Sequence, residues 1–504
     1  MKIMRKILLL LIISLVLSTE FAQARKLQKR HDIVNKVLSK IKKDNDFKNA
    51  SFGFFAIDAK TGQIVSSYNP DMALRPASNL KLITTAAVLE LYGPDYKFKT
   101  KLEYTGDIDT VTHILHGNII IKGGGDPTLG SKYFAKTKDN QFLTQWTKAI
   151  KNLHIDSIAG AVIADAGIYS RDIVPLSWSW ENMGSYFGAG ASGLSIDDDY
   201  YTIFFNTDSI IGDTAKIIKI VPEVPHLIFE NGVVADTVSG DESYILGAPY
   251  CNIRYLRGKL PFGKINFGVK GSLPDPAYFA AYELEKTLRE NGIKIKDKPS
   301  SIRLLEISGK RVSGHQTEIT TTYSPPLSKI IEQTNLYSIN LFAENFLDQS
   351  GLKLIGKAET ELDAKAMMNF WKEKGMDIQG MALTDGCGLS QYDAITPRQI
   401  VFVLNYMKKH SPYFNAYYNS LPEAGQGGAL EGTLEGMFKG SPADGNLRAK
   451  SGTIDRVKAY SGYVKSRSGR EIIFSMIVNN FSGTSREVTA KLEKLMTALS
   501  ELKK

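Results

Sequence analysis

A serine and a lysine three positions apart, Ser78-x-x-Lys81, are the most reactive combination in this sequence. On a helix the two side chains lie one turn apart on the same face, so the lysine amine can reach the serine hydroxyl. The start of a helix also favours developing negative charge, because its first backbone N–H groups are unpaired. An ordinary lysine, with a pKa of about 10.4, is protonated at neutral pH, but burial and a second cation lower that pKa. The pair therefore predicts a serine nucleophile whose base is Lys81.

Two later motifs can complete such a site. Ser338-x-Asn340 follows a polar break between two helical patterns, which suits a hydroxyl that relays protons and an amide that orients a substrate. Lys450 can be the second cation, and it begins the string Lys-Ser-Gly-Thr at the entrance to a strand-turn-strand pattern. A glycine on such a strand, here Gly452, allows a ligand backbone to pair with the sheet edge. Lys450 can then bind a substrate carboxylate.

Each motif alone carries little information, because similar strings occur elsewhere in the chain. Taken singly, Ser78 is most simply a helix N-cap before a surface lysine, Ser338 an ordinary helix cap, and the lysine string a turn. Placement separates the three motifs from their copies, which fall on a lysine-rich helix, at a strand end beside a proline and in a turn. These copies are Ser39-x-x-Lys42, Ser67-x-Asn69 and Lys60-Thr-Gly62.

The helices and strands that position the motifs follow a similar pattern at the two ends of the chain. A helical pattern and a hairpin begin it, and a hairpin and a helical pattern end it. We therefore predict an α/β fold of the α+β type, in which both hairpins share one antiparallel sheet, the terminal helices cover it and further helices form a second layer. The ranges at the ends are 32–43, 52–57, 63–68, 459–464, 471–478 and 486–502. The other predicted helices are one opened by Pro76-Ala-Ser78 and those at 277–290, 327–332, 339–347, 361–374 and 397–409.

Between residues 97 and 292 the pattern changes to short strands and glycine-rich turns, with one clear helix at 142–153. We interpret this stretch as a strand-rich insertion of one or two subdomains, which shapes substrate access and takes no part in the chemistry. Its predicted strands include 101–104, 113–121, 200–205 and 217–221. The expected organisation is a signal peptide at 1–24, the catalytic domain at 25–96, the insertion at 97–292 and the rest of the catalytic domain at 293–504.

The first 24 residues have the pattern of a secretory signal. A basic start precedes an apolar run from Ile7 to Leu17 and the small-x-small string Ala22-Gln23-Ala24. The run falls short of the ~20 apolar residues that a spanning helix needs, so we expect cleavage, no stable membrane anchor and a periplasmic or extracytoplasmic protein. The net charge of +9 comes without a basic block of the kind that marks nucleic-acid binding, so no nucleic-acid partner is expected.

Cysteines and histidines point to no metal and no cofactor. The chain has two cysteines, Cys251 and Cys387, which we interpret as unpaired and buried, although export would permit a disulfide. The pair His113-x-x-His116 has no second group of ligands beside it in the sequence and is interpreted as a surface feature.

The order Ser-x-x-Lys, Ser-x-Asn and Lys-(Thr/Ser)-Gly resembles the signature of penicillin-binding proteins and serine β-lactamases. The 260 positions from Ser78 to Ser338 are similar to the low-molecular-mass class C penicillin-binding proteins, the S13 peptidase family, whose extra domains are inserted there. Longer strings from about residue 52 to the C-terminus also resemble this family: Gly123-Gly-Gly-Asp-Pro-Thr-Leu129, Trp178-Ser-Trp180, Ser324-Pro-Pro-Leu327, Asp385-Gly-Cys-Gly-Leu-Ser390 and Ala449-Lys-Ser-Gly-Thr453.

The resemblance implies a transpeptidase-like catalytic domain with assigned roles. Ser78 forms the acyl-enzyme, Lys81 is the base and Ser338 passes a proton to the leaving amine. Asn340 holds the substrate amide, and Lys450 anchors the terminal carboxylate. The backbone N–H groups of Ser78 and Thr453 form the oxyanion hole. The other implied substrate-binding residues are Ser451, Gly452 and, near the stem-peptide side chain, Asp165.

The implied activity is that of a serine-type D-alanyl-D-alanine carboxypeptidase, or by the same chemistry an endopeptidase, acting on peptidoglycan stem peptides and acylated by β-lactam antibiotics. Two other functions stay open: a serine β-lactamase, and a non-catalytic wall-binding or β-lactam-sensing module. Ser338, where class C β-lactamases have tyrosine, and the long insertion count against the first, and three intact motifs against the second. Cys387 replaces the family's usual small hydroxyl residue, and we interpret it as packing. The oligomeric state is not predicted.

Overall fold

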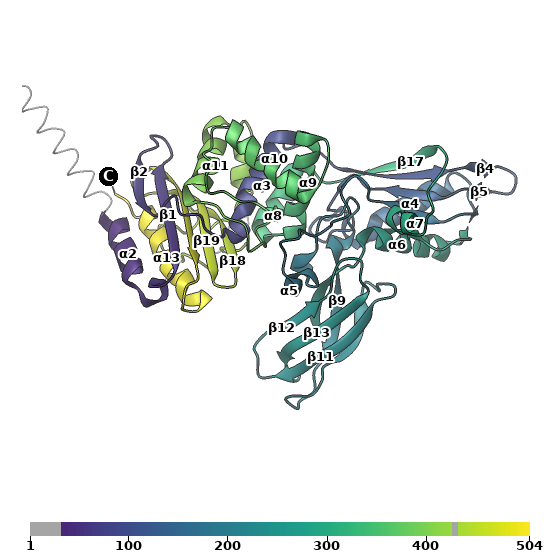
Figure 1. Cartoon of the computed structure of the whole chain (residues 1–504), viewed down its shortest axis with the longest axis horizontal. Coiled ribbons are helices and arrows are strands. Elements are labelled where there is room, and N and C mark those ends of the chain that lie inside the picture. Colours follow the sequence, from purple (N-terminus) through teal and green to yellow (C-terminus); the bar gives the residue numbers. More distant parts are fainter. Residues whose placement is uncertain (1–31, 426–431, 504) are drawn as a thin grey trace, which may run out of the picture. The chain divides into compact units, whose positions relative to one another are not determined.

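The structure is a computed structural model that describes residues 32–425 and 432–503 (Figure 1). The predicted signal at residues 1–24 lies outside this range. The chain forms two compact units, each with its own sheets and core. Unit 1 comprises residues up to Asn79 together with Ala394–His410 and Leu421–Lys504, and unit 2 comprises Leu80–Asp393 and Ser411–Ser420.

Unit 1 is built on one antiparallel sheet with the strand order β18-β19-β20-β1-β2. The prediction that the first and last hairpins share a sheet is confirmed, because β1 pairs with β20 along its whole length, with Phe54 opposite Met476. The strand that carries the lysine string, β18, is an edge strand. The bounds are β1 (Ser51–Asp58), β2 (Ile64–Tyr68), β18 (Arg448–Ile454), β19 (Val457–Lys465) and β20 (Glu471–Asn479).

Helices cover both faces of this sheet. Successive side chains of β1 point to opposite faces, and each set packs on a different helix or pair of helices. Phe52, Phe54 and Ala56 point into a core shared with α2 (Asp32–Lys43) and α13 (Ser485–Ser500). Gly53 points the other way, against Pro397 of α11 (Pro397–His410), where an added Cβ would lie 2.8 Å from the proline ring. The terminal helices therefore bury one face, as predicted, and α11 covers the other.

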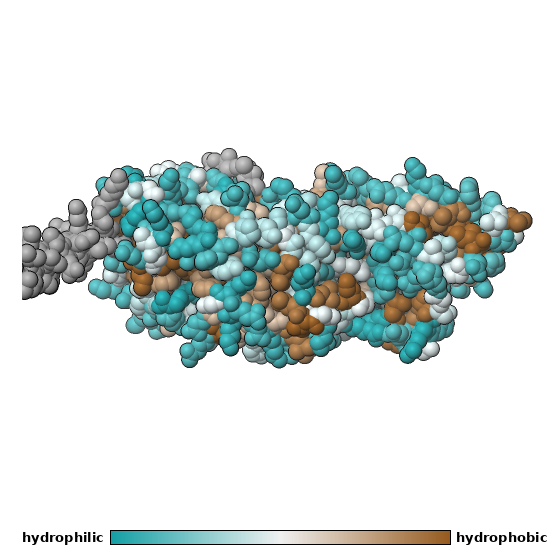
Figure 2. Space-filling model, turned by 90° about the horizontal axis from the view of Figure 1, so that it is seen from above, coloured by the Kyte–Doolittle hydropathy of each residue, from teal (hydrophilic) through white to brown (hydrophobic). Residues whose placement is uncertain are grey.

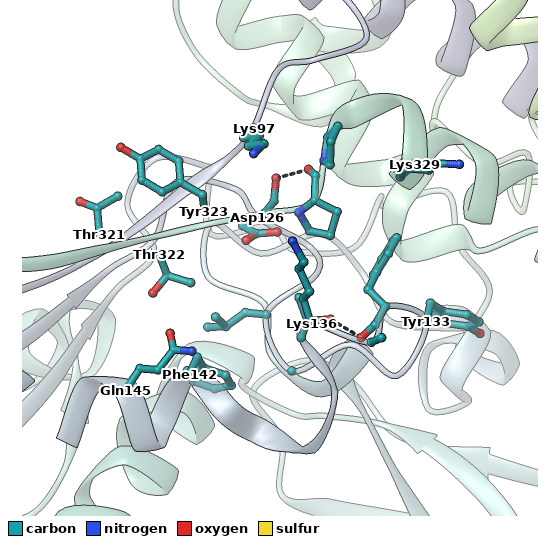
Figure 3. Close-up of a pocket in the computed structure, with 18 of the residues that line it drawn as sticks. Lys97, Asp126, Tyr133, Lys136, Phe142, Gln145, Thr321, Thr322, Tyr323 and Lys329 are labelled. Atoms are coloured by element: carbon teal, nitrogen blue, oxygen red, sulfur yellow. Dashed lines mark hydrogen bonds between the residues drawn. The ribbon is translucent and has the colours of Figure 1, made fainter. Parts of the chain in front are cut away.

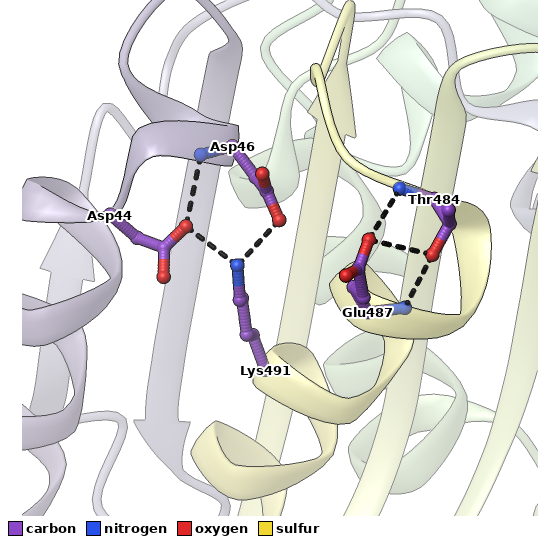
Figure 4. A network of polar contacts seen from close by, with 5 residues as sticks. All are labelled: Asp44, Asp46, Thr484, Glu487 and Lys491. Carbon is purple, nitrogen blue, oxygen red and sulfur yellow. Dashed lines mark hydrogen bonds and ion pairs between the residues drawn. The ribbon is translucent and has the colours of Figure 1, made fainter.

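Helix α13 begins with a capping box, and its second turn is bound to the N-terminal segment by a lysine (Figure 4). Thr484 Oγ1 accepts a hydrogen bond from Glu487 N (3.2 Å), and a Glu487 carboxylate oxygen accepts one from Thr484 N (2.9 Å). One turn on, Lys491 Nζ bridges the carboxylates of Asp44 (2.6 Å) and Asp46. These contacts fix the register of α13 against the segment that leads into β1.

Unit 2 contains a group of helices that carries two of the three motifs. Helix α3 (Lys81–Tyr92) contacts α8 (Leu327–Tyr337), α9 (Asn340–Ile355) and α10 (Thr360–Glu373), and α12 (Phe414–Asn419) packs on α3 and α8. The predicted helices are present, with one correction at the first motif. Ser78 lies in the 3-10 turn η2 (Ala77–Leu80), and the α-helix proper begins only at Lys81.

The strand-rich part of unit 2 has four sheets, with the orders β16-β8-β6-β3-β17, β15-β7-β5-β4, β10-β9-β14 and β11-β13-β12. The predicted strand at 113–121 is broken at Gly117, where a side chain would collide with the Thr105 carbonyl oxygen at 1.7 Å. The bounds are β3 (Lys99–Thr105), β4 (Asp107–Asp109), β5 (Ile114–His116), β6 (Ile119–Lys122), β7 (Ser157–Ile158), β8 (Val162–Asp165), β9 (Tyr200–Asn206), β10 (Lys216–Val221), β11 (Ile228–Asp236), β12 (Glu242–Leu246), β13 (Ile253–Pro261), β14 (Phe267–Ser272), β15 (Lys294–Ile295), β16 (Ser300–Ser301) and β17 (Gln316–Tyr323).

These sheets share a core with two helices, α4 (Gln141–Lys151) and α6 (Pro276–Glu290). Strands β15, β16 and β17 follow residue 292 in the chain and still pair with strands of the stretch predicted as an insertion. Phe98 and Ser324 lie directly before and after this strand-rich stretch. Two hydrogen bonds join them: Ser324 N donates to Phe98 O (3.1 Å), and Phe98 N donates to Ser324 Oγ (2.9 Å). The sheets therefore reach residue 323, beyond the expected boundary at 292.

The surface view shows hydrophilic residues over most of the face drawn, with apolar residues in separate groups (Figure 2). No helix within the described ranges is both long and apolar enough to span a bilayer. The prediction of two buried cysteines is wrong for Cys251, which is exposed, and confirmed for Cys387. Cys251 lies directly after a turn and before β13, in an exposed stretch of the chain.

Candidate active site

In unit 1 the turn that carries Ser78 packs directly on the edge strand that carries the lysine string. A Cβ added to Gly452 of β18 would lie 2.8 Å from Pro76 O and 3.1 Å from Asn79 N, both in or beside η2. Only a glycine permits this approach, because real Cβ atoms do not come that close to backbone atoms. The fold therefore brings Ser78 next to the strand Lys450–Thr453, and the close approach at Gly452 is to the protein's own backbone. The approach of a ligand backbone to Gly452 stays a prediction.

Asn79 anchors this turn to the sheet from within. Its Nδ2 donates to Ser461 Oγ (2.7 Å) on β19, and Ser461 Oγ donates to Ser475 Oγ (2.8 Å) on β20. All three residues are buried. The turn is thus held by a polar chain that runs across two strands, which fixes the backbone N–H of the neighbouring Ser78.

The lysine string occupies β18 with a buried cation. Lys450 pairs with Ser461 across the β18–β19 ladder, is fully buried, and its Nζ donates to Ser451 O (2.9 Å). At the exposed end of the string, Lys458 Nζ donates to Thr453 Oγ1 (3.0 Å), and burial lowers the pKa of Lys458. Two ammonium groups therefore flank the edge of the sheet on which a substrate backbone is expected.

In unit 2 the lysine of the first motif is fully buried between α9 and a loop. Lys81 Nζ donates to Asn340 Oδ1 (2.6 Å) and to Cys387 O (2.9 Å). Burial lowers the pKa of Lys81, and the nearby groups Cys387, Asp385 and Glu344 oppose that change. The structure thus joins Lys81 of the first motif to Asn340 of the second.

The second motif lies at the junction of two helices. Ser338 ends α8 in the left-handed region (φ 59°), and Asn340 is the first residue of α9. The left-handed residue turns the chain sharply, so the amide of Asn340 reaches Lys81 on one side and donates from Nδ2 to Phe187 O (2.8 Å) on the other. No pattern in the sequence links Phe187 to Asn340, because 153 positions separate the two residues.

The loop that binds Lys81 is organised by the carboxylate of Asp385. Asp385 Oδ1 accepts from Gly388 N (2.7 Å), and Oδ2 accepts from Ser390 N (2.7 Å) and from Trp178 Nε1 (2.9 Å). Thr84, one turn after Lys81, donates to Gly386 O (2.7 Å). These bonds hold the Cys387 carbonyl in position for the lysine ammonium or amine group.

Glu344 is a buried acid one turn after Asn340 on α9, and the sequence analysis missed it. Its Oε1 accepts from Gly386 N (2.9 Å). Burial, and then the charge of Asp385, raise the pKa of Glu344 to about 8, and burial also raises the pKa of the Cys387 thiol. The available signal was a glutamate four positions after Asn340, directly after the apolar string Leu341-Phe-Ala343.

Glu344, Asp385 and Cys387 form a buried group whose potential ligand atoms lie within 4.8 Å of one another in the described part of the chain. They do not fit a metal ion. Both Asp385 oxygens and Glu344 Oε1 already accept backbone N–H bonds, and the burial that raises the pKa values of Glu344 and Cys387 favours their neutral forms. We therefore assign the group to holding Lys81.

Asp165 is not joined to these residues by any hydrogen bond or ion pair of the described structure. It ends β8, is half-buried, and its Oδ1 accepts from Gly167 N (2.9 Å) in a local turn. Its assignment to the stem peptide remains a prediction.

A separate cavity of about 560 Å³ opens elsewhere in unit 2 (Figure 3). It lies among the loop at 126–137, α4, β17 and the start of α8, with Asp126 near its centre. Burial raises the pKa of Asp126 to about 6, although Thr128 donates to it from N (2.8 Å) and Oγ1 (2.6 Å). None of the predicted site residues lines this cavity.

Comparison with known proteins agrees with this geometry. The sequence model of the D-Ala-D-Ala carboxypeptidase 3 (S13) family matches residues 34–501. A D-alanyl-D-alanine carboxypeptidase of Actinomadura sp. (strain R39) is 25% identical over 451 residues, which cover 88% of this chain and 80% of that protein. D-alanyl-D-alanine carboxypeptidase DacB of Haemophilus influenzae is 23% identical over 464 residues, 89% of each chain.

Among solved structures, penicillin binding protein 4 (dacB) from Haemophilus influenzae has the same fold. Its TM-score is 0.77 at 22% identity, and the match covers 90% of this chain and 97% of that one. The same protein complexed with a β-lactam matches with a TM-score of 0.70. The predicted fold class, a penicillin-binding type of α/β fold with an antiparallel sheet and a helical layer, is confirmed.

Proposed function

The chain belongs to the D-Ala-D-Ala carboxypeptidase 3 (S13) family and is a serine-type D-alanyl-D-alanine carboxypeptidase; on this premise we propose that Ser78 is its nucleophile and Lys81 its base. The substrate is the stem peptide of peptidoglycan, and β-lactams acylate the same serine. One observation carries the assignment: Lys81 is fully buried, and both of its hydrogen bonds named above go to neutral oxygens.

The two acceptors of Lys81 suit a neutral amine. A neutral amine has two N–H bonds and one lone pair, and Asn340 Oδ1 and Cys387 O account for two N–H bonds. A neutral amine at this position can take a proton from a serine hydroxyl. Burial lowers the pKa of Lys81, which favours the neutral form that a general base needs. Ser78 precedes Lys81 by three residues of continuous helical backbone, η2 and the first residue of α3.

The reaction follows as two acyl transfers. Ser78 Oγ attacks the carbonyl of the penultimate D-alanine while its proton passes to Lys81 Nζ. The backbone N–H groups of Ser78 and Thr453 stabilise the oxyanion, which in related enzymes contributes about 3–4 kcal/mol for one donor. The C–N bond then breaks, and Ser338 delivers a proton to the leaving amine of the terminal D-alanine. Water hydrolyses the acyl-enzyme with the same residues in reverse.

Substrate binding uses the sheet edge and the second motif. The stem peptide adds to β18 by backbone pairing, Lys450 binds its terminal carboxylate, and Ser451 and Gly452 face its backbone. Asn340 orients the amide of the residue before the scissile bond, and Asp165 contacts the stem-peptide side chain. An endopeptidase activity differs only in a leaving group that is longer than D-alanine.

The nucleophile can be tested by trapping the acyl-enzyme. We expect mass spectrometry of penicillin-treated protein to locate one adduct on the peptide that contains Ser78, and Ser78→Ala to carry none. Ser39→Ala is the matched control, because Ser39-x-x-Lys42 has the same spacing on the exposed face of α2; it should be acylated like the wild type. An adduct that persists in Ser78→Ala would contradict the assignment.

The stability of the adduct separates this function from the two alternatives. A carboxypeptidase releases D-alanine from peptides and keeps the penicilloyl group for a long time, whereas a β-lactamase releases it quickly. A sensing module is acylated but turns over no peptide. Burst kinetics with a penicillin, together with release of D-alanine from a D-Ala-D-Ala peptide, distinguish the three.

We also propose that the protein is exported and cleaved after residue 24. The proposal rests on the sequence of residues 1–24 and on the extracytoplasmic position of peptidoglycan. Expression of the full chain in a Gram-negative host, followed by N-terminal sequencing of the periplasmic protein, should give a first residue of Arg25. A full-length protein retained in the cytoplasm contradicts the proposal.

A further inference from the structure

A strand with an open edge forms part of the wall of the cavity of about 560 Å³ that Figure 3 shows, named here the β17 cavity. Strand β17 is the outermost strand of the sheet β16-β8-β6-β3-β17, and it pairs along one side with β3. An outermost strand presents, on its other side, backbone N–H and C=O groups that no strand of the same sheet uses. This side of β17 can therefore pair with an added chain.

The cavity meets β17 along that open edge. Its wall includes four consecutive residues of the strand, Thr320–Tyr323. Successive side chains of a strand point to opposite faces of the sheet, so a cavity on one face would be lined by every second residue only. Thr322 points toward α4, because its Oγ1 accepts a hydrogen bond from Trp146 Nε1 (2.8 Å), and its two neighbours in the strand point to the other face. The cavity therefore lies against the edge between the two faces.

The rest of the wall is mainly apolar. The rings of Phe142 and Trp146 pack edge to face with their centroids 4.8 Å apart. A cavity of a few hundred Å³ with apolar walls and a small number of polar groups is typical of a ligand site. A side chain from a strand added to β17 can thus be buried on this wall. Its apolar members are Leu129, Phe134, Phe142, Trp146, Pro325 and Pro326.

The charged groups of the wall give it a positive excess. They are one aspartate and three lysines, Asp126, Lys97, Lys136 and Lys329. Lys329 forms an ion pair within α8 and points away from Asp126 in Figure 3. Among the residues that the structure describes, Lys97 and Lys136 take part in no ion pair and no side-chain hydrogen bond, so Asp126 does not neutralise them. Two ammonium groups without a carboxylate partner favour an anionic ligand.

We propose that the β17 cavity is a docking site for an acidic, extended segment of a protein partner, which adds to β17 as a further strand. Backbone pairing with the edge supplies affinity, and alternate side chains of the added strand supply specificity. Its carboxylates contact Lys97 and Lys136, and an apolar side chain packs on Phe142 and Trp146. This function is additional to the carboxypeptidase activity, since none of the predicted catalytic or substrate-binding residues lines the cavity.

The test is calorimetric titration of the intact protein with a blocked octapeptide of alternating glutamate and valine. We expect one peptide to bind per chain. The glutamine analogue should bind about tenfold more weakly, the size of one charge-assisted hydrogen bond. An analogue with N-methylated valines should also bind at least about tenfold more weakly, because it lacks backbone donors for the strand edge.

Variants of the protein locate the binding site. In Lys97→Gln/Lys136→Gln the difference between the glutamate and glutamine peptides should disappear. Ala135→Trp should lower the affinity for the glutamate peptide by at least about tenfold, because Ala135 is exposed and lines the cavity. Lys216→Gln/Lys219→Gln is the matched control and should bind like the wild type, because these two lysines also lie on an edge strand, β10.

Each outcome decides for or against the docking site. No binding of the glutamate peptide, equal binding of the glutamine or N-methylated analogue, or unchanged binding to Ala135→Trp overturns it. Displacement of the bound peptide by a D-Ala-D-Ala peptide also overturns it, because the peptide would then occupy the substrate site. The rate of penicillin acylation should stay unchanged in all variants, which shows that they are folded and keeps this test independent of the assignment of the nucleophile.

Discussion

At the scale of single residues, the protein buries one basic group, Lys81, together with the acidic groups Glu344 and Asp385. Lys81 is desolvated, which lowers its pKa, while Glu344 and Asp385 beside it act in the opposite direction. Burial raises the pKa of Glu344 to about 8 and so favours its neutral form. Burial therefore shifts Lys81 and Glu344 toward their neutral forms, because a buried charge without a partner is costly in a protein interior.

Substitution should separate the roles of the two motif lysines. Lys81→Ala is expected to lower the rate of penicillin acylation by about 10²–10⁴-fold, the contribution of a general base. Lys450→Ala should mainly raise KM for peptides with a free terminal carboxylate and leave part of the acylation rate. Stopped-flow acylation of both variants, with Lys42→Ala as the control on α2, checks this. Identical kinetics of the two variants on substrates with and without the carboxylate contradict the assignment.

Glu344 should make stability depend on pH. Its pKa is about 8 in the folded protein against an ordinary 4.5, so the folded state binds the extra proton between these values. Its contribution to the free energy of unfolding is complete below pH 4.5 and is lost as the pH rises through 8, by a few kcal/mol. Glu344→Gln should lack this loss. Denaturant unfolding at several pH values from 4 to 9 measures it, and parallel curves for the two proteins contradict the assigned pKa.

At the scale of elements, the two ends of the nucleophile's turn are fixed by different means. The turn η2 is held on the sheet by the missing side chain of Gly452 and by the chain from Asn79 to Ser461. The following α3 is buried along most of its length among α8, α9 and α10. The short turn is therefore supported at both ends, which suits a nucleophile that must not move during the reaction.

Filling the space at Gly452 should misplace that turn. Gly452→Ala puts a Cβ 2.8 Å from Pro76 O, so the backbone of η2 must shift. We expect acylation to slow by about 10–100-fold, the effect of a small misplacement of reacting groups, with the fold retained by circular dichroism. Gly240→Ala is the control, because nothing lies within 4 Å of its added Cβ. Acylation at the wild-type rate in Gly452→Ala contradicts the close approach.

The cap of α13 should contribute to stability without touching the chemistry. Thr484→Ala removes the acceptor for Glu487 N and is expected to lower the free energy of unfolding by about 1 kcal/mol. Chemical denaturation measures this change. Thr484→Ser retains the hydroxyl and should restore most of it, and the acylation rate should stay unchanged in both variants.

At the scale of the whole molecule, the strand-rich part has a core of its own but is hydrogen-bonded to residues outside it. Its core is formed by residues between Leu102 and Ile295, and its two ends meet in hydrogen bonds between Phe98 and Ser324. Yet Trp178 donates to Asp385 (2.9 Å) and Phe187 accepts from Asn340 (2.8 Å). The strand-rich part therefore supplies hydrogen-bond partners to Asp385 and Asn340, and its role in substrate access stays a prediction.

Its removal should affect two activities to different degrees. A variant in which a short Gly-Ser linker replaces residues 99–323 can close, because Phe98 and Ser324 are already hydrogen-bonded. We expect penicillin acylation to fall by about tenfold, since Asp385 and Asn340 lose one partner each, and stem-peptide turnover to fall much further because remote contacts are lost. Thermal unfolding must first show a folded variant.

Two further measurements make this deletion informative. Trp178→Phe in the full chain removes only the donor to Asp385 and should reproduce part of the loss in acylation. Stem-peptide turnover at the intact rate in a folded deletion variant contradicts a substrate role for the strand-rich part.

The sequence by itself determined the three motifs, the family, the two terminal hairpins and most of the helices. These are local properties, because the spacing of Ser78 and Lys81 and the apolar periodicity of each element act over a few residues. It also predicted the shared sheet, since two hairpins with matching apolar faces bury them best together.

Only the tertiary structure decided which groups surround the motif lysine and how far the strand-rich part extends. Glu344 and Cys387 reach Lys81 from segments about 260 and 306 positions away, and β17 joins β3 across more than 200 residues. Such contacts form only when whole helices and sheets pack against one another and exclude water. A local pattern of residue types does not show which distant segments will meet.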